Sequence, residues 1–266
     1  MNIAAFDFDG TIVFPDGIAT STIDAIHAWQ HAGHLAVAAT GKSLSTAHHV
    51  LHGSRLTFDY SVLCTGAVIT NRHDQVLHSA FLDPAAVRRI IDQPRHVDGV
   101  AVYATTLHAP DVRLSSTVAY GTQTTILQNF QDIQVDTVDN HEFIGMPIWV
   151  PDNPALQQQL FSWITDTFDV GCVINQDFID IIPAGTSKGA GLQWLINHLG
   201  FERGEVELFT FGDSFNDLSM HAIADHSFSL PWSPAKIHAA TDEVIESVDQ
   251  ALTRLLETPP VKTHAL

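Results

Sequence analysis

Four short groups of residues along the chain are of the types that handle phosphate and a divalent cation. They are Asp7-Phe8-Asp9-Gly10-Thr11, Thr40-Gly41, Lys188-Gly189 and Gly212-Asp213-Ser214-Phe215-Asn216-Asp217. Carboxylates gathered in one place repel each other, and this repulsion raises their pKa values. A Mg²⁺ ion takes oxygen ligands, relieves the repulsion and can bridge to a phosphate. One carboxylate can then attack phosphorus, while a hydroxyl and an ammonium group hold the phosphate oxygens.

These groups can meet only if the elements that carry them end at one edge of a sheet. Residues Asn2 to Phe8, Leu35 to Ala39 and Val206 to Phe211 are short apolar runs that predict buried strands. The first contains Asp7 near its end and leads directly into Asp9, and the others lead directly into a threonine and a Gly-Asp pair. Ligands of open parallel sheets bind beyond the carboxyl ends of the strands. We therefore expect one site there, built from distant parts of the chain.

The order of predicted elements favours an α/β fold. Helical patterns over Ser43 to His52 and Ser187 to Leu199 alternate with strand-like runs, including Tyr60 to Cys64. A helix over Ser214 to Ala224 and a short edge strand over Phe228 to Leu230 follow. Strands that alternate with helices predict a Rossmann-like parallel-sheet core with helices on both faces.

The middle of the chain has a different character, because its β-branched runs carry more polar residues. Three strands and two helices are predicted there: Val100 to Thr105, Phe143 to Val150, Cys172 to Ile182, Pro84 to Gln93 and Pro154 to Phe168. This pattern predicts an inserted α+β cap domain with an antiparallel sheet. The expected division is residues 1–82 and 184–266 for the core and residues 83–183 for the cap.

Composition excludes several classes of protein. The 266 residues are 45% hydrophobic, which is enough for a sizeable core. The net charge of −18, from 12 basic and 30 acidic residues, argues against a nucleic-acid partner. Cys64 and Cys172 lie far apart in apolar runs and are expected to be buried free thiols, which suits a reducing cytosol. Neither a signal peptide nor a membrane span is predicted, so we expect a cytoplasmic monomer or homodimer that binds no membrane.

The four groups, in this order, match the motifs of the haloacid dehalogenase superfamily, which the chain resembles over nearly its whole length. The long insertion between Thr40 and Lys188 resembles the α+β cap of the class IIB members, the Cof-type sugar phosphatases. Each motif alone is less specific than the ordered set. The resemblance implies a Mg²⁺-dependent phosphomonoester hydrolase that acts on a small phosphorylated metabolite, such as a sugar phosphate, through an aspartyl-phosphate intermediate.

The resemblance also implies a role for each motif residue. Asp7 would be the nucleophile and a metal ligand, and Asp9 the general acid/base, with its backbone carbonyl on the metal. The expected phosphate-binding residues are Thr40 and Lys188, together with the backbone near Gly10 and Gly41. Asp213 would be a metal ligand, and Asn216 and Asp217 would support the metal and Lys188.

Three positions depart from the pattern of this family. Lys42 stands where relatives often have arginine, and lysine lacks the planar fork of arginine. Thr65-Gly66 replaces a common Asn-Gly, and Leu230-Pro231-Trp232-Ser233 replaces a common Gly-Asn-Ala. The latter two changes leave the four motifs intact but weigh against a standard substrate assignment.

Simpler interpretations stay open for single motifs. Asp-Gly after a strand is typical of a turn, and Ser214 with Asp217 is typical of a helix cap. A phosphate-binding P-loop at Gly41 is excluded, because Ala36 occupies the position of its first glycine. For the whole set, the alternatives are a phosphomutase, or a catalytically weak binding or regulatory protein on the same scaffold. Four cap residues could reach the leaving group, although a solvated or structural role is favoured for each: His108, His141, Asp177 and Asp180.

Overall fold

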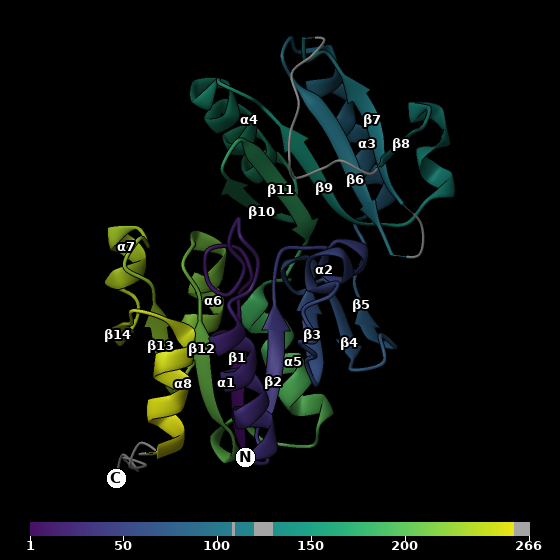
Figure 1. Ribbon diagram of the computed structural model, residues 1–266. Helices are drawn as coiled ribbons and strands as arrows, with labels where there is room; N and C mark the ends of the chain where they lie inside the picture. The colour runs from purple at the N-terminus through teal and green to yellow at the C-terminus, as the bar shows by residue number, and fades with distance from the viewer. Residues whose placement is uncertain (108–109, 120–129, 258–266) are drawn as a thin grey trace.

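The computed structural model describes residues 1–107, 110–119 and 130–257, and it contains two β-sheets, one above the other (Figure 1). The lower sheet has the strand order β14-β13-β12-β1-β2-β3-β4-β5, and the upper sheet has the order β10-β11-β9-β6-β7-β8. The predicted α/β class, with a parallel core sheet and an inserted α+β part, is confirmed. Among the described helices, none has the length and apolar character that crossing a membrane requires.

Six neighbouring strands of the lower sheet run parallel, and two more complete one edge with antiparallel pairing. The parallel strands are β1 (Asn2–Phe6), β2 (Leu35–Ala39), β3 (Tyr60–Leu63), β12 (Glu207–Phe211), β13 (His226–Ser229) and β14 (Glu243–Val244). The antiparallel strands are β4 (Val68–Asn71) and β5 (Val76–Ser79). Because β1 lies between β2 and β12, and Phe6 pairs with Phe211, the residues that follow these strands meet at one edge.

Helices cover both faces of this sheet, as the alternation of side chains along β1 requires. Ala4 and Phe6 face α1 (Thr20–His31), α2 (Leu44–Leu51) and α8 (Val248–Glu257), which pack in one cluster. Ile3 and Ala5 face α5 (Lys188–His198) and α6 (Leu218–His221) on the opposite side. The short helix α7 (Ala235–His238) follows β13.

The upper sheet is antiparallel except where β7 pairs with β8. Its strands are β6 (Ala101–Thr106), β7 (Asp111–Ser116), β8 (Phe130–Asp132), β9 (Phe143–Trp149), β10 (Val170–Asn175) and β11 (Phe178–Pro183). Helices α3 (Pro84–Asp92) and α4 (Pro154–Thr167) bury apolar residues against the same face. Ala101, Tyr103, Trp149 and Phe178 form a smaller cluster on the other face.

The upper part sits above the carboxyl edge of the lower sheet (Figure 1). The amide of Leu82 donates to the carbonyl of Phe143 at 2.8 Å, which ties the outgoing connection to β9. Ile144 of β9 belongs to the apolar cluster of the lower sheet. Strand β10 lies beside the 3₁₀ turn Phe215–Asp217.

Three predicted elements differ from the structure. Cys172 to Ile182 is not one strand but the hairpin β10–β11, which turns at Gln176 with a φ of +50°. The run Phe228 to Leu230 is not an edge, because β14 pairs outside β13. The helix predicted over Ser214 to Ala224 is a 3₁₀ turn followed by the short α6. Both cysteines are free; Cys64 is buried as expected, whereas Cys172 is only partly buried.

Candidate active site

Asp7 and Asp9 lie where β1 leaves the sheet. The amide of Asp7 donates to the carbonyl of Phe211 at 2.9 Å, so Asp7 still belongs to the ladder and is only 5% exposed. The carbonyl of Phe8 then accepts from the amides of Thr11, Ile12 and Val13, which turns the chain sharply. Gly10 takes a φ of +76°, and the turn leaves the Asp9 side chain 66% exposed.

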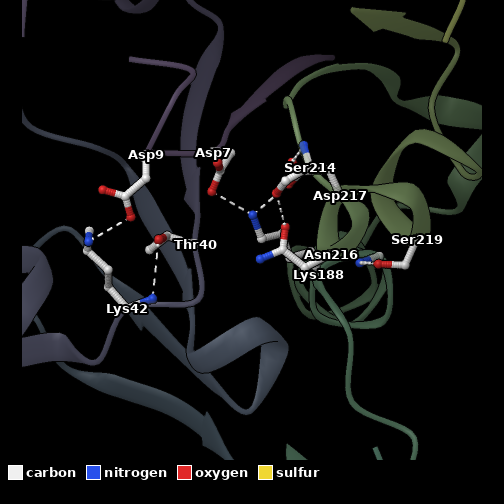
Figure 2. Close-up of polar contacts among 10 residues, drawn as sticks. Asp7, Asp9, Thr40, Lys42, Lys188, Ser214, Asn216, Asp217 and Ser219 are labelled. Atoms are coloured by element: carbon white, nitrogen blue, oxygen red, sulfur yellow. Dashed lines mark hydrogen bonds and ion pairs between the residues drawn. The ribbon is translucent and has the colours of Figure 1, made fainter. Parts of the chain in front are cut away.

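Lys188 joins two of the predicted acidic residues. Its ammonium lies 2.6 Å from Oδ1 of Asp7 and 2.6 Å from Oδ1 of Asp217, and the side chain is fully buried (Figure 2). Ser187 caps α5 by accepting from the amide of Ala190, which fixes the start of the helix and therefore Lys188. Burial opposes the charge, but Asp217 and Asp7 outweigh it and raise the pKa of Lys188 above its usual value.

Asp217 is held on both of its oxygens. While Oδ1 accepts from Lys188, Oδ2 accepts from the amide of Ser214 at 2.9 Å and from its hydroxyl at 3.3 Å. The prediction that Ser214 and Asp217 cap a helix is therefore confirmed. The same hydrogen bonds orient Asp217 toward Lys188. Gly212 leaves room for this arrangement, since a Cβ there would lie 2.5 Å from Cγ of Asp217.

Three carboxylates converge beside this lysine. Asp7, Asp213 and Asp217 each offer an oxygen within 4.8 Å of the others. Burial raises the pKa of Asp7 to about 7 against the opposing effect of Lys188. Burial, assisted by Asp217, raises the pKa of Asp213 to about 6. With one lysine for three carboxylates, the cluster has a deficit of positive charge.

Asp213 provides the test of whether this cluster suits a cation. Its Oδ1 is buried and has no hydrogen-bond partner among the residues that the structure describes. A buried acceptor without a partner costs free energy, and a divalent cation with oxygen ligands would satisfy it. Because both oxygens of Asp217 are already engaged, Asp7 and Asp213 fit the role of ligands better than Asp217 does. The carboxylate of Asp9 lies outside the cluster.

The second motif lies on the other side of Asp7. Thr40 is 1% exposed, and its Oγ1 accepts from the amide of Lys42 at 3.2 Å. The ammonium of Lys42 turns back and lies 2.7 Å from Oδ2 of Asp9 (Figure 2). A Cβ on Gly41 would lie 3.4 Å from Oγ1 of Thr65 and 3.8 Å from Nδ2 of Asn216, so the second motif approaches these two side chains closely at Gly41.

The backbone around Thr65 is unusual. Cys64 and Thr65 have φ values of 49° and 53°, which non-glycine residues rarely adopt and a β-branched residue adopts least readily. Gly66 follows with a φ of +100°, and a Cβ there would lie 2.1 Å from the carbonyl oxygen of Ser187. The third-strand loop is thereby packed against the start of α5, and it directs the Thr65 hydroxyl toward Gly41.

Two carboxylates of the upper sheet raise the pKa of a thiol in the same loop. Burial, with smaller contributions from Asp111 and Asp180, raises the pKa of the Cys64 thiol to about 12. The cap sheet therefore brings negative charge near the core beside the third-strand loop. Asp111 is buried and was not identified from the sequence, because it begins a strand without any motif around it.

The structure thus gathers the predicted residues at one edge. Asp7, Lys188, Asp213 and Asp217 form the centre, and Thr40, Gly41 and Asn216 lie around it. Gly10 also lies there, since a Cβ on it would be 2.4 Å from Oδ2 of Asp213. Its amide, however, donates to the carbonyl of Val13 at 3.0 Å, so a contact of this amide with phosphate remains a prediction.

The four cap residues singled out from the sequence are not gathered in the same way. His141 stacks on Phe143 with ring centroids 5.8 Å apart, which is a structural contact. Asp177 is exposed in the β10–β11 turn, whereas Asp180 is partly buried in β11. His108 lies outside the described residues. The contact of Lys42 with Asp9 was not predicted, although the departure at Lys42 had singled out that position.

Comparison with known proteins identifies the family to which the chain is similar. A sequence profile of the haloacid dehalogenase-like hydrolases matches residues 4–252. The HMP-PP phosphatase of Citrobacter koseri is 25% identical over 227 residues, which are 82% of this chain and 79% of that protein. The chloroplastic endoribonuclease YBEY of Arabidopsis thaliana is 36% identical over 90 residues, but the match covers 33% of this chain and only 15% of that protein.

Solved structures share the fold. One described as a subclass IIB sugar phosphatase of this superfamily has a TM-score of 0.78 and 20% identity, with 97% of this chain and 100% of that chain covered. A haloacid dehalogenase-like hydrolase from B. subtilis has a TM-score of 0.81 and 16% identity, with 98% and 100% covered.

Proposed function

Because the chain belongs to the haloacid dehalogenase-like hydrolases, we propose that it is a Mg²⁺-dependent phosphatase that cleaves small phosphorylated metabolites through a phosphorylated Asp7. The observation that carries the proposal is the arrangement of Asp7, Lys188, Asp217 and Asp213. One lysine orients two buried carboxylates, and Oδ1 of Asp213 has no partner within the described part of the chain. A phosphatase in Citrobacter koseri and a sugar phosphatase of the same fold support this substrate class.

Asp7 would act as the nucleophile. Lys188 holds its Oδ1, which restrains the carboxylate just beyond the end of β1. One carboxylate oxygen attacks phosphorus, and the bond between phosphorus and the leaving oxygen breaks. The hydroxyl of Thr40 and the ammonium of Lys188 would hold the phosphate oxygens, which carry the charge that develops in the transition state.

Asp9 would act as the general acid and then as the general base. It gives a proton to the leaving oxygen in the first step. In the second step it takes a proton from water, whose oxygen attacks phosphorus and releases phosphate and Asp7. Lys42 holds Oδ2 of Asp9, so Oδ1 is the oxygen left for these transfers.

A divalent cation would be held by Asp7 and Asp213, and by the backbone carbonyl of Asp9 as the family resemblance implies. When bound, it would neutralise charge on the phosphate and relieve the repulsion within the carboxylate cluster. Asn216 and Asp217 would support this centre through Ser214 and Lys188.

The upper sheet would serve as a cap over the leaving group. We place the boundaries of this cap at residues 83 and 183. Residue 83 lies in the connection between β5 and α3, and residue 183 is the last residue of β11, before the connection to α5. A cap that closes over the site excludes bulk water during the transfer.

The central test is Asp7→Asn, which keeps the shape of the side chain but removes the nucleophile. Phosphate release from p-nitrophenyl phosphate with Mg²⁺ should be lost, while circular dichroism stays unchanged. Asp24→Asn, an exposed carboxylate on α1, is the matched control and should keep the wild-type rate. Full activity of Asp7→Asn, or of wild type in EDTA, would contradict the proposal.

Asp9→Asn tests the proton-transfer role separately. It should slow breakdown of the phosphorylated Asp7, so that rapid-quench experiments show a lower steady-state rate after the first turnover. Unchanged burst and steady-state rates would remove Asp9 from the mechanism. Continued release of phosphate by wild type would also distinguish a phosphatase from a phosphomutase.

A further inference from the structure

Trp232 makes two contacts with the loop that carries Asp9. Its indole Nε1 donates to the carbonyl of Gly10 at 2.8 Å, across 222 residues of sequence. Its ring meets Phe14 edge to face, with centroids 5.5 Å apart and an interplanar angle of 88°. Trp232 is nevertheless 52% exposed, so burial alone does not explain its position.

The tip of this loop needs such a contact, because residues 14–17 are held mainly by their own backbone, whereas Thr11 and Ile12 before them are buried. Gly10 donates to Val13, and Phe14 and Gly17 exchange two backbone hydrogen bonds. Pro15, Asp16 and Gly17 are exposed, so the tip of the loop has little packing of its own. Such a segment opens locally at low cost unless another element restrains it.

The hydrogen bond from Trp232 to Gly10 restrains the backbone close to Asp9. The carbonyl of Gly10 belongs to the second peptide group after the Cα of Asp9, and Gly10 lies directly against the carboxylate of Asp213. A donor on this carbonyl therefore restrains the backbone between the proposed proton carrier and the proposed metal ligand. Reacting groups must be held closely to work, and a small displacement lowers the rate strongly.

We propose that Trp232 is a positioning residue for the general acid: its indole N–H fixes the Asp9–Gly10–Thr11 backbone so that Asp9 reaches the leaving oxygen. This inference rests on the proposed function. It assigns a role to the one segment, Leu230 to Ser233, in which the chain departs from the family near its carboxyl end.

The test is Trp232→Phe, which removes the N–H and keeps an aromatic ring against Phe14. Trp194→Phe is the matched control, because Trp194 lies on α5 between His78 and His198 and touches none of the motif residues through these contacts. Both variants, with wild type, are assayed on p-nitrophenyl, phenyl and p-methoxyphenyl phosphate. A leaving group whose phenol is a weaker acid depends more on protonation by Asp9.

We expect Trp232→Phe to lose about fivefold more kcat/KM on p-methoxyphenyl phosphate than on p-nitrophenyl phosphate, which is the factor that corresponds to about 1 kcal/mol for one hydrogen bond. Trp194→Phe should leave this ratio unchanged. A purely structural Trp232 would lower all three rates equally, and that result would overturn the proposal.

Hydrogen exchange supplies a readout that does not depend on catalysis. In Trp232→Phe, amides of residues 9–17 should exchange about fivefold faster than in wild type, for the same reason. Unchanged exchange would show that the indole does not restrain the loop and would also overturn the proposal. If wild type released no phosphate at all, the proposed function itself would fail, which is a different outcome from a uniform loss in the variant.

Discussion

Replacing Lys188 by methionine should destabilise the fold far more than a lysine substitution ordinarily does. Lys188 is completely buried, and its ammonium makes two charge-assisted hydrogen bonds of 2.6 Å. Methionine fills much of the volume but leaves Asp7 and Asp217 buried without their shared cation. Each such bond contributes about 1.5–3 kcal/mol, and removing one partner of a buried ion pair costs about 3–5 kcal/mol. We expect a loss of about 3–5 kcal/mol in the free energy of unfolding at neutral pH.

Lys42→Met is the matched control, because it also removes a lysine paired with a motif aspartate. The Asp9 side chain in that pair is 66% exposed, and exposed ion pairs contribute about 0–1 kcal/mol. Urea unfolding in EDTA, followed by circular dichroism and tryptophan fluorescence, measures both variants.

Two further results belong to the same reasoning. Adding Asp217→Asn to Lys188→Met removes one of the stranded charges and should recover part of the lost stability. The loss should also shrink as pH falls, because protonation neutralises the carboxylate of Asp7, whose pKa burial raises to about 7. If Lys188→Met costs no more than Lys42→Met, or costs the same at every pH, the buried lysine does not hold the two carboxylates as argued.

Two other predictions concern the proposed metal site and the packing of α5 against α6. The folded pKa values of Asp7, about 7, and Asp213, about 6, exceed the unfolded value of 3.8, so their contribution to stability is complete below pH 3.8 and is lost as pH rises through 6 and 7. Mg²⁺ should therefore raise the thermal midpoint more at about pH 8 than at about pH 5, and an equal increase at both would contradict the assignment. Gly189→Ala should cost about 1–3 kcal/mol in urea unfolding, because its Cβ would lie 2.1 Å from the carbonyl oxygen of Ser219. Gly204→Ala, with no atom within 4 Å, should be nearly neutral; similar losses for both variants would refute the packing argument.

The parallel core was predictable because its strands are short, apolar and clearly bounded. The predicted strand from Leu35 to Ala39 has the same limits in the structure, since Gly33 ends the preceding helix and Thr40 follows the last buried alanine. The hairpin of β10 and β11 was missed because apolar residues continue on both sides of its turn. The turn at Gln176 has no glycine to mark it, so periodicity alone could not divide the run.

The location of the centre was also predictable, because parallel strands deliver Asp7 and Asp213 to the same edge. Contacts that depend on the conformation of loops could not be predicted from the sequence. The pairing of Lys42 with Asp9 and the bond from Trp232 to Gly10 join separate segments, and no spacing rule connects them. The position of β13 inside the sheet depends on β14, a strand of two residues that is too short to leave a pattern.

The placement of β1 between β2 and β12 has a consequence for how a cell makes this protein. Chains emerge from the ribosome with their first residues leading, and β1 must wait for Glu207–Phe211 before its second neighbour exists. Until then one side of this apolar strand offers unpaired amides and carbonyls, which invite pairing between nascent chains. The hairpins of β6–β7 and β10–β11 need only nearby sequence and can form in the meantime. Chains interrupted before residue 207 should therefore aggregate through β1, the strand that leads to the proposed nucleophile Asp7.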